Sequence, residues 1–218
     1  MIAGDDLMTQ YSVFCAALLV VYLVPGPDMF LLLNTGASQG RRQALITALG
    51  LALARAAHVT LAALGLAALL RTHPWAFELL SVAGGLYLAW MGWQLLCAPV
   101  ATLPGAPTGA RQPGHWAVAL KKGLLTNLLN PKALLFCSVL LPQFVSQAAG
   151  PVGQQFAILG AVLVITGLLF DGFYALSGDR LGRWLAQSPW KQKLQNRLFG
   201  TLLIGFGARL ILLRELSN

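Results

Sequence analysis

Hydrophobic residues along this chain lie in long uninterrupted runs rather than in short alternating patterns. A helix rises about 1.5 Å per residue, so a run of about 20 apolar residues is long enough to cross roughly 30 Å of hydrocarbon. We place six such runs at residues 11–33, 44–69, 75–97, 117–143, 154–177 and 198–213. The pattern predicts an all-α integral membrane protein with six transmembrane helices.

Composition agrees with a chain whose main solvent is lipid. Of the 218 residues, 57% are hydrophobic and 10% are charged, whereas about 25% charged is typical of soluble domains. The runs leave little chain for anything else, so we expect one membrane domain over residues 1–218. The net charge of +8 does not indicate nucleic acid, because Lys and Arg lie mainly between the apolar runs rather than on a soluble basic face.

A proline- and glycine-rich segment at residues 98–116 divides the chain and is typical of a flexible, solvated linker. Three predicted spans precede it in residues 1–97, and three follow it in residues 117–218. With three spans per half, the second half enters the membrane upside down relative to the first, as in inverted-repeat transporters. Aligning Pro27 with Pro131, and Gly85 with Gly200, gives this arrangement weak support from the sequence.

The basic residues of the loops predict the orientation. Short cytoplasmic loops carry an excess of Lys and Arg, and the first, third and fifth loops together hold ten of them. The opposite side holds only Arg71 and Arg214. We therefore expect a multi-pass protein with its linker in the cytoplasm and both termini outside it.

The first run contains a break, Val24-Pro25-Gly26-Pro27-Asp28. Each proline removes an amide donor and frees a carbonyl one turn earlier, and Gly26 adds flexibility. Broken backbone within a membrane is tolerated only against protein or a water-filled cavity. The first predicted helix should break here, although the prolines of a merely kinked, packed helix would look the same.

The fourth run has a similar break at Asn130-Pro131-Lys132. Asn130 suits an N-cap and Pro131 a first helical residue, so a half-helix beginning here would direct free amides at the break. Such amides suit an anion, and a substrate carboxylate is the obvious one. Asn127 lies one turn earlier, where it could line the same cavity or cap a freed carbonyl.

Ionisable residues deep in membrane spans are costly and indicate functional sites. Here they are Asp28, Arg55, His58, Lys132 and Asp171. Two acids and two strong bases could form a neutral network that a proton or a zwitterion unbalances. The alternative is a static pairing of Asp28 with Lys132 or of Arg55 with Asp171, and His58 suits a hydrogen-bonded packing residue as well as a proton relay.

Nothing in the sequence indicates a metal, a cofactor or a catalytic site. Cys15, Cys97 and Cys137 lie singly in or at the ends of apolar runs, without a CxxC pair or zinc-like histidine spacing. No HExxH motif, acidic diphosphate-binding run or Ser-His-Asp set stands out either. We expect neither cofactor nor enzyme activity.

At these residues the sequence resembles the LysE/RhtB family of amino-acid exporters. The matching features are Pro25-Gly26-Pro27-Asp28, the segment from Gly50 to Leu70 with His58, Asn127 and Asn130-Pro131-Lys132-Ala133, and the Gly-rich last run. The resemblance covers nearly the whole chain. Arg55 has no clear counterpart in the family pattern.

The resemblance implies export of amino acids or close derivatives across a bacterial inner membrane, in exchange for protons. On this interpretation the substrate- or ion-binding residues are Pro25, Gly26, Pro27, Asp28, Arg55, His58, Asn127, Asn130, Pro131, Lys132 and Asp171. Two alternatives are an intramembrane redox carrier and a passive channel or accessory membrane subunit. The sequence does not identify the amino acid, and it leaves the oligomeric state open, a homo-oligomer included.

Overall fold

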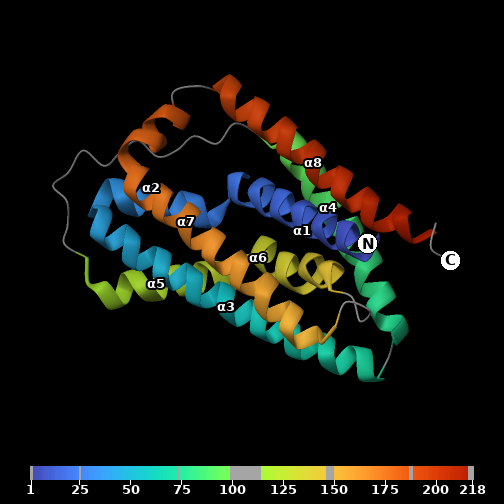
Figure 1. Cartoon of the computed structure of the whole chain (residues 1–218). Coiled ribbons are helices and arrows are strands. Elements are labelled where there is room, and N and C mark those ends of the chain that lie inside the picture. Colours follow the sequence, from blue (N-terminus) through green and yellow to red (C-terminus); the bar gives the residue numbers. More distant parts are fainter. Residues whose placement is uncertain are drawn as a thin grey trace.

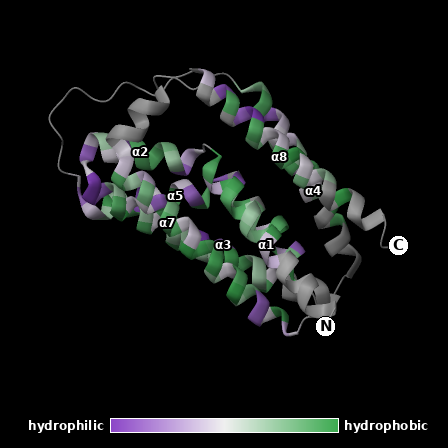
Figure 2. Ribbon diagram, turned by 45° about the horizontal axis from the view of Figure 1, so that its top comes forward, coloured by the Kyte–Doolittle hydropathy of each residue, from purple (hydrophilic) through white to green (hydrophobic). Residues whose placement is uncertain are grey.

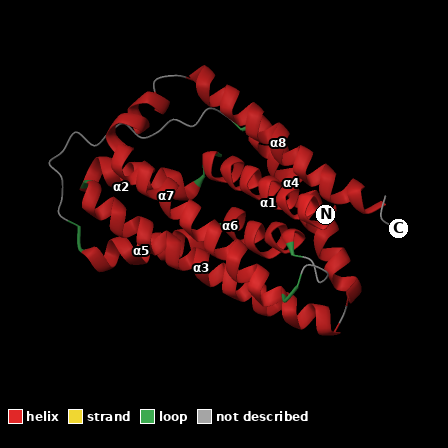
Figure 3. Ribbon diagram, viewed as in Figure 1, coloured by secondary structure: helices red, strands yellow, loops and turns green. Residues whose placement is uncertain are grey.

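The chain folds as a bundle of helices. The structure is a computed structural model and describes residues 2–24, 26–72, 74–98, 114–145, 150–186 and 189–215. All secondary structure in these ranges is helical (Figure 3), which confirms the prediction of an all-α protein for this part of the chain. The elements are α1 (Ile2–Leu23), α2 (Pro27–Gln39), α3 (Arg41–Thr72), α4 (Pro74–Cys97), α5 (Trp116–Leu128), α6 (Pro131–Leu135), the π-helix η1 (Phe136–Leu140), the 3-10 helix η2 (Leu141–Phe144), α7 (Val152–Ala186) and α8 (Pro189–Glu215).

Two pairs of consecutive helices bend sharply where the sequence places its proline-containing breaks. Helix α1 from Tyr11 meets α2 at 50°, and α5 meets the segment Lys132–Phe144 at 63°. At the first bend Gly26 is extended (φ −162°) and Pro27 begins α2. Pro25 lies outside the described residues. At the second bend the Asn130 side chain accepts a hydrogen bond from the Lys132 amide at 3.0 Å and caps α6.

Within the described residues, two helices are individually long and apolar enough to cross a membrane. They lie at Arg41–Gly65 in α3 and Val152–Gly178 in α7. Counting each bent pair as one span raises the number to four, and α4 contributes a shorter apolar helix at Val82–Cys97. The six predicted spans therefore stay a prediction.

The distribution of polar and apolar side chains is the reverse of that in a soluble protein. Arg55, Asp171 and Asn127 are at most 3% exposed, while Leu64 and Leu169 on the outer faces are 65% and 70% exposed. Figure 2 shows hydrophobic residues along most of the length of the helices. Soluble monomers rarely expose large contiguous apolar surfaces, so this arrangement suits a protein surrounded by lipid.

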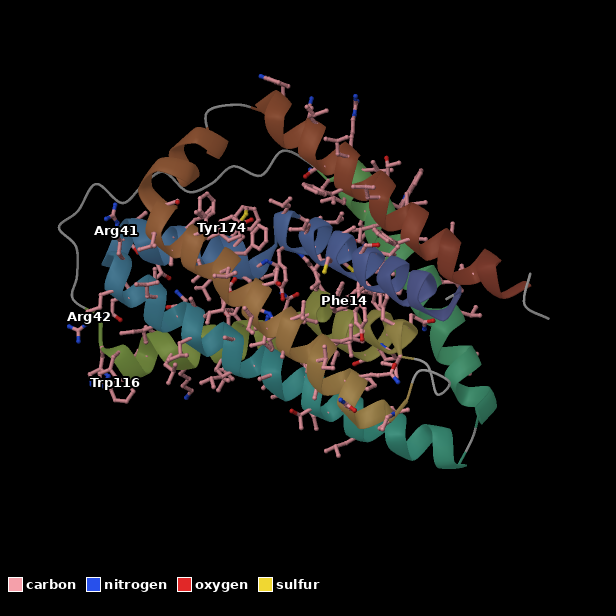
Figure 4. All side chains as sticks on the ribbon, in the orientation of Figure 1. Phe14, Arg41, Arg42, Trp116 and Tyr174 are labelled. Atoms are coloured by element: carbon pink, nitrogen blue, oxygen red, sulfur yellow. The ribbon has the colours of Figure 1, made fainter. Side chains whose placement is uncertain are left out.

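Two apolar clusters lie on either side of the bends. The first contains mainly large side chains from α1, η1, η2 and the first half of α7, including Phe14, Phe136 and Phe156. The second joins α2 and the first half of α3 to α7 near Tyr174, and it includes Ala44, Ala48 and Ala175. Figure 4 labels one residue of each cluster, Phe14 and Tyr174.

Near the second cluster, helix backbones approach each other closely at glycines. A Cβ added to Gly36 would lie 3.1 Å from the Ala175 carbonyl of α7, and one added to Gly123 would meet the Thr47 carbonyl of α3. The contact at Gly36 would be tighter than nine in ten real Cβ contacts, and the one at Gly123 would be closer than the 3.0 Å that real Cβ atoms essentially never cross. These helices are therefore packed backbone to backbone.

Helices α4 and α8 run side by side along one flank of the molecule (Figures 1 and 2). Their contact is made by two glycine pairs, Gly85 with Gly207 and Gly92 with Gly200. A Cβ on Gly85 would lie 2.9 Å from the Gly207 carbonyl oxygen, and one on Gly200 would lie 2.7 Å from the Gly92 carbonyl oxygen. Small residues allow such close antiparallel packing between membrane helices.

Candidate functional site

Both helix bends open onto one cavity of about 50 Å³. By this measure a water needs about 10–15 Å³, so the cavity has room for a few waters, well short of the roughly 300–1,000 Å³ of small-molecule pockets. The cavity would have to widen to hold a molecule larger than a few waters. Polar and charged side chains from six helices line the cavity together with apolar ones; the polar and charged ones are Tyr22, Asp28, Arg55, Asn127, Asn130, Lys132, Asp171 and Tyr174.

Asp28, in the first turn of α2, accepts two hydrogen bonds from the other bent pair. Asn127 Nδ2 donates to Asp28 Oδ2 at 2.6 Å, and Asn130 Nδ2 donates to Asp28 Oδ1 at 3.0 Å. A carboxylate at a helix N-terminus also interacts favourably with the helix dipole. Asp28 therefore holds the two bends together and occupies the place of an anion there.

Arg55, from the middle of α3, lies between the two acids. Its Nη2 donates to Asp171 Oδ2 at 3.0 Å and lies 3.8 Å from Asp28 Oδ2. The guanidinium carbon stacks 5.1 Å from the centroid of the Tyr22 ring. Both Arg55 and Asp171 side chains are 4% exposed, so this is a buried ion pair. Arg55 Nη1 and Asn127 Oδ1 are buried atoms without a hydrogen-bond partner among the described residues.

Lys132, in the first turn of α6, reaches across to the first bend. Its Nζ donates to the Val24 carbonyl oxygen at 2.9 Å, and a Cβ added to Gly26 would lie 3.5 Å from that nitrogen. No ion pair within 4.0 Å joins Lys132 to an acid in the part of the chain that the structure describes. Of the two static pairings considered from the sequence, the Arg55–Asp171 pair is present, and Lys132 instead neutralises the carbonyl end of α1.

His58 and Asn127 stabilise the second bend. His58 Nε2 lies 3.2 Å from the Asn127 carbonyl oxygen, the carbonyl that Pro131 cannot satisfy for lack of an amide hydrogen. A carbonyl oxygen only accepts, so Nε2 carries the hydrogen in this contact. The same carbonyl also accepts from the Asn130 amide at 3.0 Å, so His58 is its second donor, while the Asn127 side chain points to Asp28.

Two tyrosines complete the site, and neither was singled out from the sequence. Tyr174 donates its hydroxyl to the Tyr22 carbonyl at 2.9 Å, and Tyr22 donates its hydroxyl to the Leu163 carbonyl of α7 at 2.8 Å. The sequence held a signal for each. Tyr22 lies one turn before the first proline break, and Tyr174 lies three residues after Asp171, on the same helix face.

Of the eleven residues predicted for the site, the structure brings Gly26, Asp28, Arg55, Asn127, Asn130, Lys132 and Asp171 together around the cavity. His58 contacts it only through Asn127. Pro27 and Pro131 begin the helices that border it. Asn130 is the N-cap of α6, as expected from the sequence, and its side chain accepts from the Lys132 amide, so that amide is not free to bind an anion.

Among the described residues, no group of three or more His, Cys, Asp or Glu side chains could hold a metal ion. The three cysteines are free; Cys137 is buried beside the cavity, and Cys15 and Cys97 are exposed. The site is thus a buried cluster of opposite charges where two bent helix pairs meet, with apolar surfaces outside it. Those features define a membrane transport protein, and the comparisons agree.

A sequence model of the LysE type translocator family matches residues 19–214, and the chain belongs to this family. The resemblance inferred from the motifs is thereby confirmed, and with it the expectation of a transporter rather than an enzyme. The leucine efflux protein of Enterobacter sp. (strain 638) is 34% identical over 190 residues, covering 87% of this chain and 89% of the relative. Leucine efflux proteins of Klebsiella pneumoniae and Salmonella typhimurium are 32% and 30% identical over 206 residues, each covering 94% of this chain and 96% of the relative. No solved structure matches the chain.

Proposed function

We propose that this chain is a secondary transporter that exports an amino acid from the bacterial cytoplasm in exchange for protons. The single observation that carries the proposal is the cluster of Asp28, Arg55, Lys132 and Asp171, in which Arg55 and Asp171 are buried, around one cavity at two helix bends. Family membership makes transport the general activity. Since relatives that align over almost their whole length are named leucine efflux proteins, leucine is the first substrate to test.

The proposed architecture has six spans in two inverted repeats, residues 1–97 and 117–218, joined by the linker at 98–116, with the first and fourth spans broken. The glycine contacts between α4 and α8 support it. In the repeat alignment Gly85 corresponds to Gly200, and Gly92 to Gly207. A two-fold axis that exchanges the repeats converts the contact Gly85–Gly207 into Gly200–Gly92, which is the other contact present. Reciprocal contacts of this kind are what an inverted repeat requires.

The proposed orientation places both termini in the periplasm and the linker in the cytoplasm, across the bacterial inner membrane. Arg41, Arg42 and Trp116 lie at one end of the bundle (Figure 4). The start of α1 and the end of α8 lie at the opposite end (Figure 1). The basic residues of the first loop are thus at the far end from the termini, as the positive-inside rule requires for this orientation.

Lys132 is the proposed partner of the substrate carboxylate. Its ammonium group donates to the Val24 carbonyl, a partner without a net charge that a carboxylate can displace, because an ion pair adds the attraction between two full charges. The neighbouring apolar side chains Val21, Met29 and Phe136 suit an apolar substrate side chain such as that of leucine. Binding therefore needs the cavity to widen.

Proton coupling is assigned to the two acids that share Arg55. A proton on Asp171 would remove the charge that holds Nη2 at 3.0 Å, leaving Asp28, 3.8 Å away, as the alternative partner. Asp28 also accepts from two side-chain amides, whereas the side-chain partner of Asp171 among the described residues is Arg55. We therefore expect Asp171→Asn to change the pH dependence of transport more than Asp28→Asn does.

Counterflow in proteoliposomes is the decisive test. Vesicles loaded with unlabelled leucine should accumulate labelled leucine transiently, and an imposed pH gradient should drive net movement in the direction opposite to protons. A passive channel would equilibrate the label without overshoot, and a redox carrier would move none. Absence of both overshoot and pH-driven movement for every amino acid tried would overturn the proposal.

A growth screen narrows the substrate if leucine fails. Cells that overproduce the protein should survive toxic concentrations of the amino acids or analogues that it exports. Cells producing the Lys132→Ala variant at the same membrane level are the matched control. Equal protection by both proteins would remove Lys132 from the substrate site.

A further inference from the structure

Helix α7 contains a buried glycine whose presence its own helix does not explain. Gly167 lies in the middle of α7 and is buried. Glycine is less favourable than alanine in a helix interior because it loses more conformational freedom on folding. Gly172, five residues later on the same helix, has open space where a Cβ would stand. At position 167, by contrast, other side chains occupy the space where a Cβ would stand.

The groups that fill the space at Gly167 belong to the polar site. A Cβ added there would collide with Arg55 Nη1, and would lie 2.6 Å from the Tyr22 hydroxyl oxygen and 2.7 Å from Arg55 Cζ. Contacts below 3.0 Å are essentially never made by real Cβ atoms. Any side chain at position 167 must therefore displace the guanidinium, the phenol or both.

Neither group can move without losing an interaction. Arg55 is held by the hydrogen bond from Nη2 to Asp171 and by stacking on the Tyr22 ring. The Tyr22 hydroxyl donates to the Leu163 carbonyl, one turn before Gly167 in α7. The charged groups that face Arg55 are Asp171 from α7 and Asp28 from α2, and Lys132 from α6 lines the same cavity.

We propose that Gly167 is a positioning residue for Arg55: the side chain it lacks leaves a socket on α7 that holds the guanidinium against Asp171 and within reach of Asp28. The same socket receives the Tyr22 hydroxyl and so docks the end of α1 onto α7. Gly167 contacts no substrate and acts only through Arg55 and Tyr22. The inference rests on the proposed function in one respect, because it assumes that the position of Arg55 controls exchange.

The test compares Gly167→Ala with Gly172→Ala, the same change on the same helix with no atom in its way. In leucine counterflow, Gly167→Ala should lose at least about tenfold in rate, the scale expected for an overpacked core site. Its pH profile of transport should shift in the same sense as that of Arg55→Lys. Gly172→Ala should stay within about twofold of the unmodified protein and keep its pH profile, because an added methyl group there has open space. Wild-type behaviour of Gly167→Ala in both readouts would overturn the proposal.

A second variant separates displacement of Arg55 and Tyr22 from a general folding defect. Tyr22→Phe loses the hydrogen bond to Leu163 in either background, but it also removes the hydroxyl oxygen that the new methyl group would approach. It should therefore lower the melting temperature of Gly167→Ala less than it lowers that of the unmodified protein. This comparison needs no transport, so it stands even if the protein does not carry leucine. If the added Phe lowers the melting temperature of Gly167→Ala as much as it lowers that of the unmodified protein, the socket is refuted.

Discussion

The buried pair of Arg55 and Asp171 gives the sharpest quantitative prediction. Removing one member of a buried ion pair leaves an uncompensated charge and costs about 3–5 kcal/mol. For Asp171→Leu we expect a loss of stability at the lower end of this range, because Asp28 remains 3.8 Å from Arg55 Nη2 and partly compensates its charge. By the scale for soluble domains of this size, about 3 kcal/mol lowers the melting temperature by roughly 6–12 °C.

Removing both charges should cost much less than the sum of the single losses. In the double variant Arg55→Met, Asp171→Leu no unpaired charge is left, and Asp28 keeps its two amide donors from Asn127 and Asn130. Buried ion pairs replaced by apolar residues of similar volume are often neutral or even stabilising. We therefore expect the double variant to melt near the unmodified protein while both single variants melt well below it.

The assay is thermal unfolding of the detergent-purified protein, paired with counterflow in proteoliposomes. A coupling energy of about 2 kcal/mol or more between the two positions is expected for groups in direct contact. Additive losses would refute the buried-pair reasoning. Full transport by the restored double variant would show that the pair only supports the fold, and would remove Asp171 from the proton pathway.

Three further predictions follow from the fold and the site. Reporter fusions should place residues 98–115 in the cytoplasm and the tail after Leu213 in the periplasm; a cytoplasmic tail would refute both the orientation and the inverted repeats. Lys132→Ala should abolish export with folded protein still in the membrane, and unchanged transport in vesicles would contradict its proposed role in binding the substrate carboxylate. Gly92→Ala should lower the melting temperature because its Cβ would lie 2.5 Å from a carbonyl of α8, whereas Gly205→Ala, with open space around it, should not.

Much of the site could be predicted because its residues violate the rules of a membrane span. Prolines within apolar runs marked the two bends, and charged residues within other runs marked Arg55 and Asp171. A charge in lipid is costly enough that a functional partner is expected from one sequence alone. The helical class and the family motifs were predictable for similar reasons.

The partners of these residues could not be predicted, because a helical pattern fixes the face of a residue but not the rotation of one helix against another. One alternative from the sequence was an ion pair of Lys132 with Asp28, yet Lys132 donates to the Val24 carbonyl. Tyr22 and Tyr174 had no polar partner that the sequence could identify. In the fold, Tyr174 donates to the Tyr22 carbonyl, and Tyr22 donates to the Leu163 carbonyl. Such contacts depend on the angle at each break, which spacing does not give.

The two apolar clusters on either side of the bends differ in how they can open. The cluster near Phe14 is closed by large side chains, with Phe14 and Phe144 in edge contact at 5.0 Å between ring centroids. Side chains can turn aside locally, whereas helices that touch through Gly36 and Gly123 must move as whole bodies, typically over microseconds to milliseconds. In the proposed orientation the cluster near Phe14 faces the periplasm, and the helix contacts at Gly36 and Gly123 face the cytoplasm. The slow step of an export cycle would then be the admission of substrate from inside the cell, and its release outside would be fast.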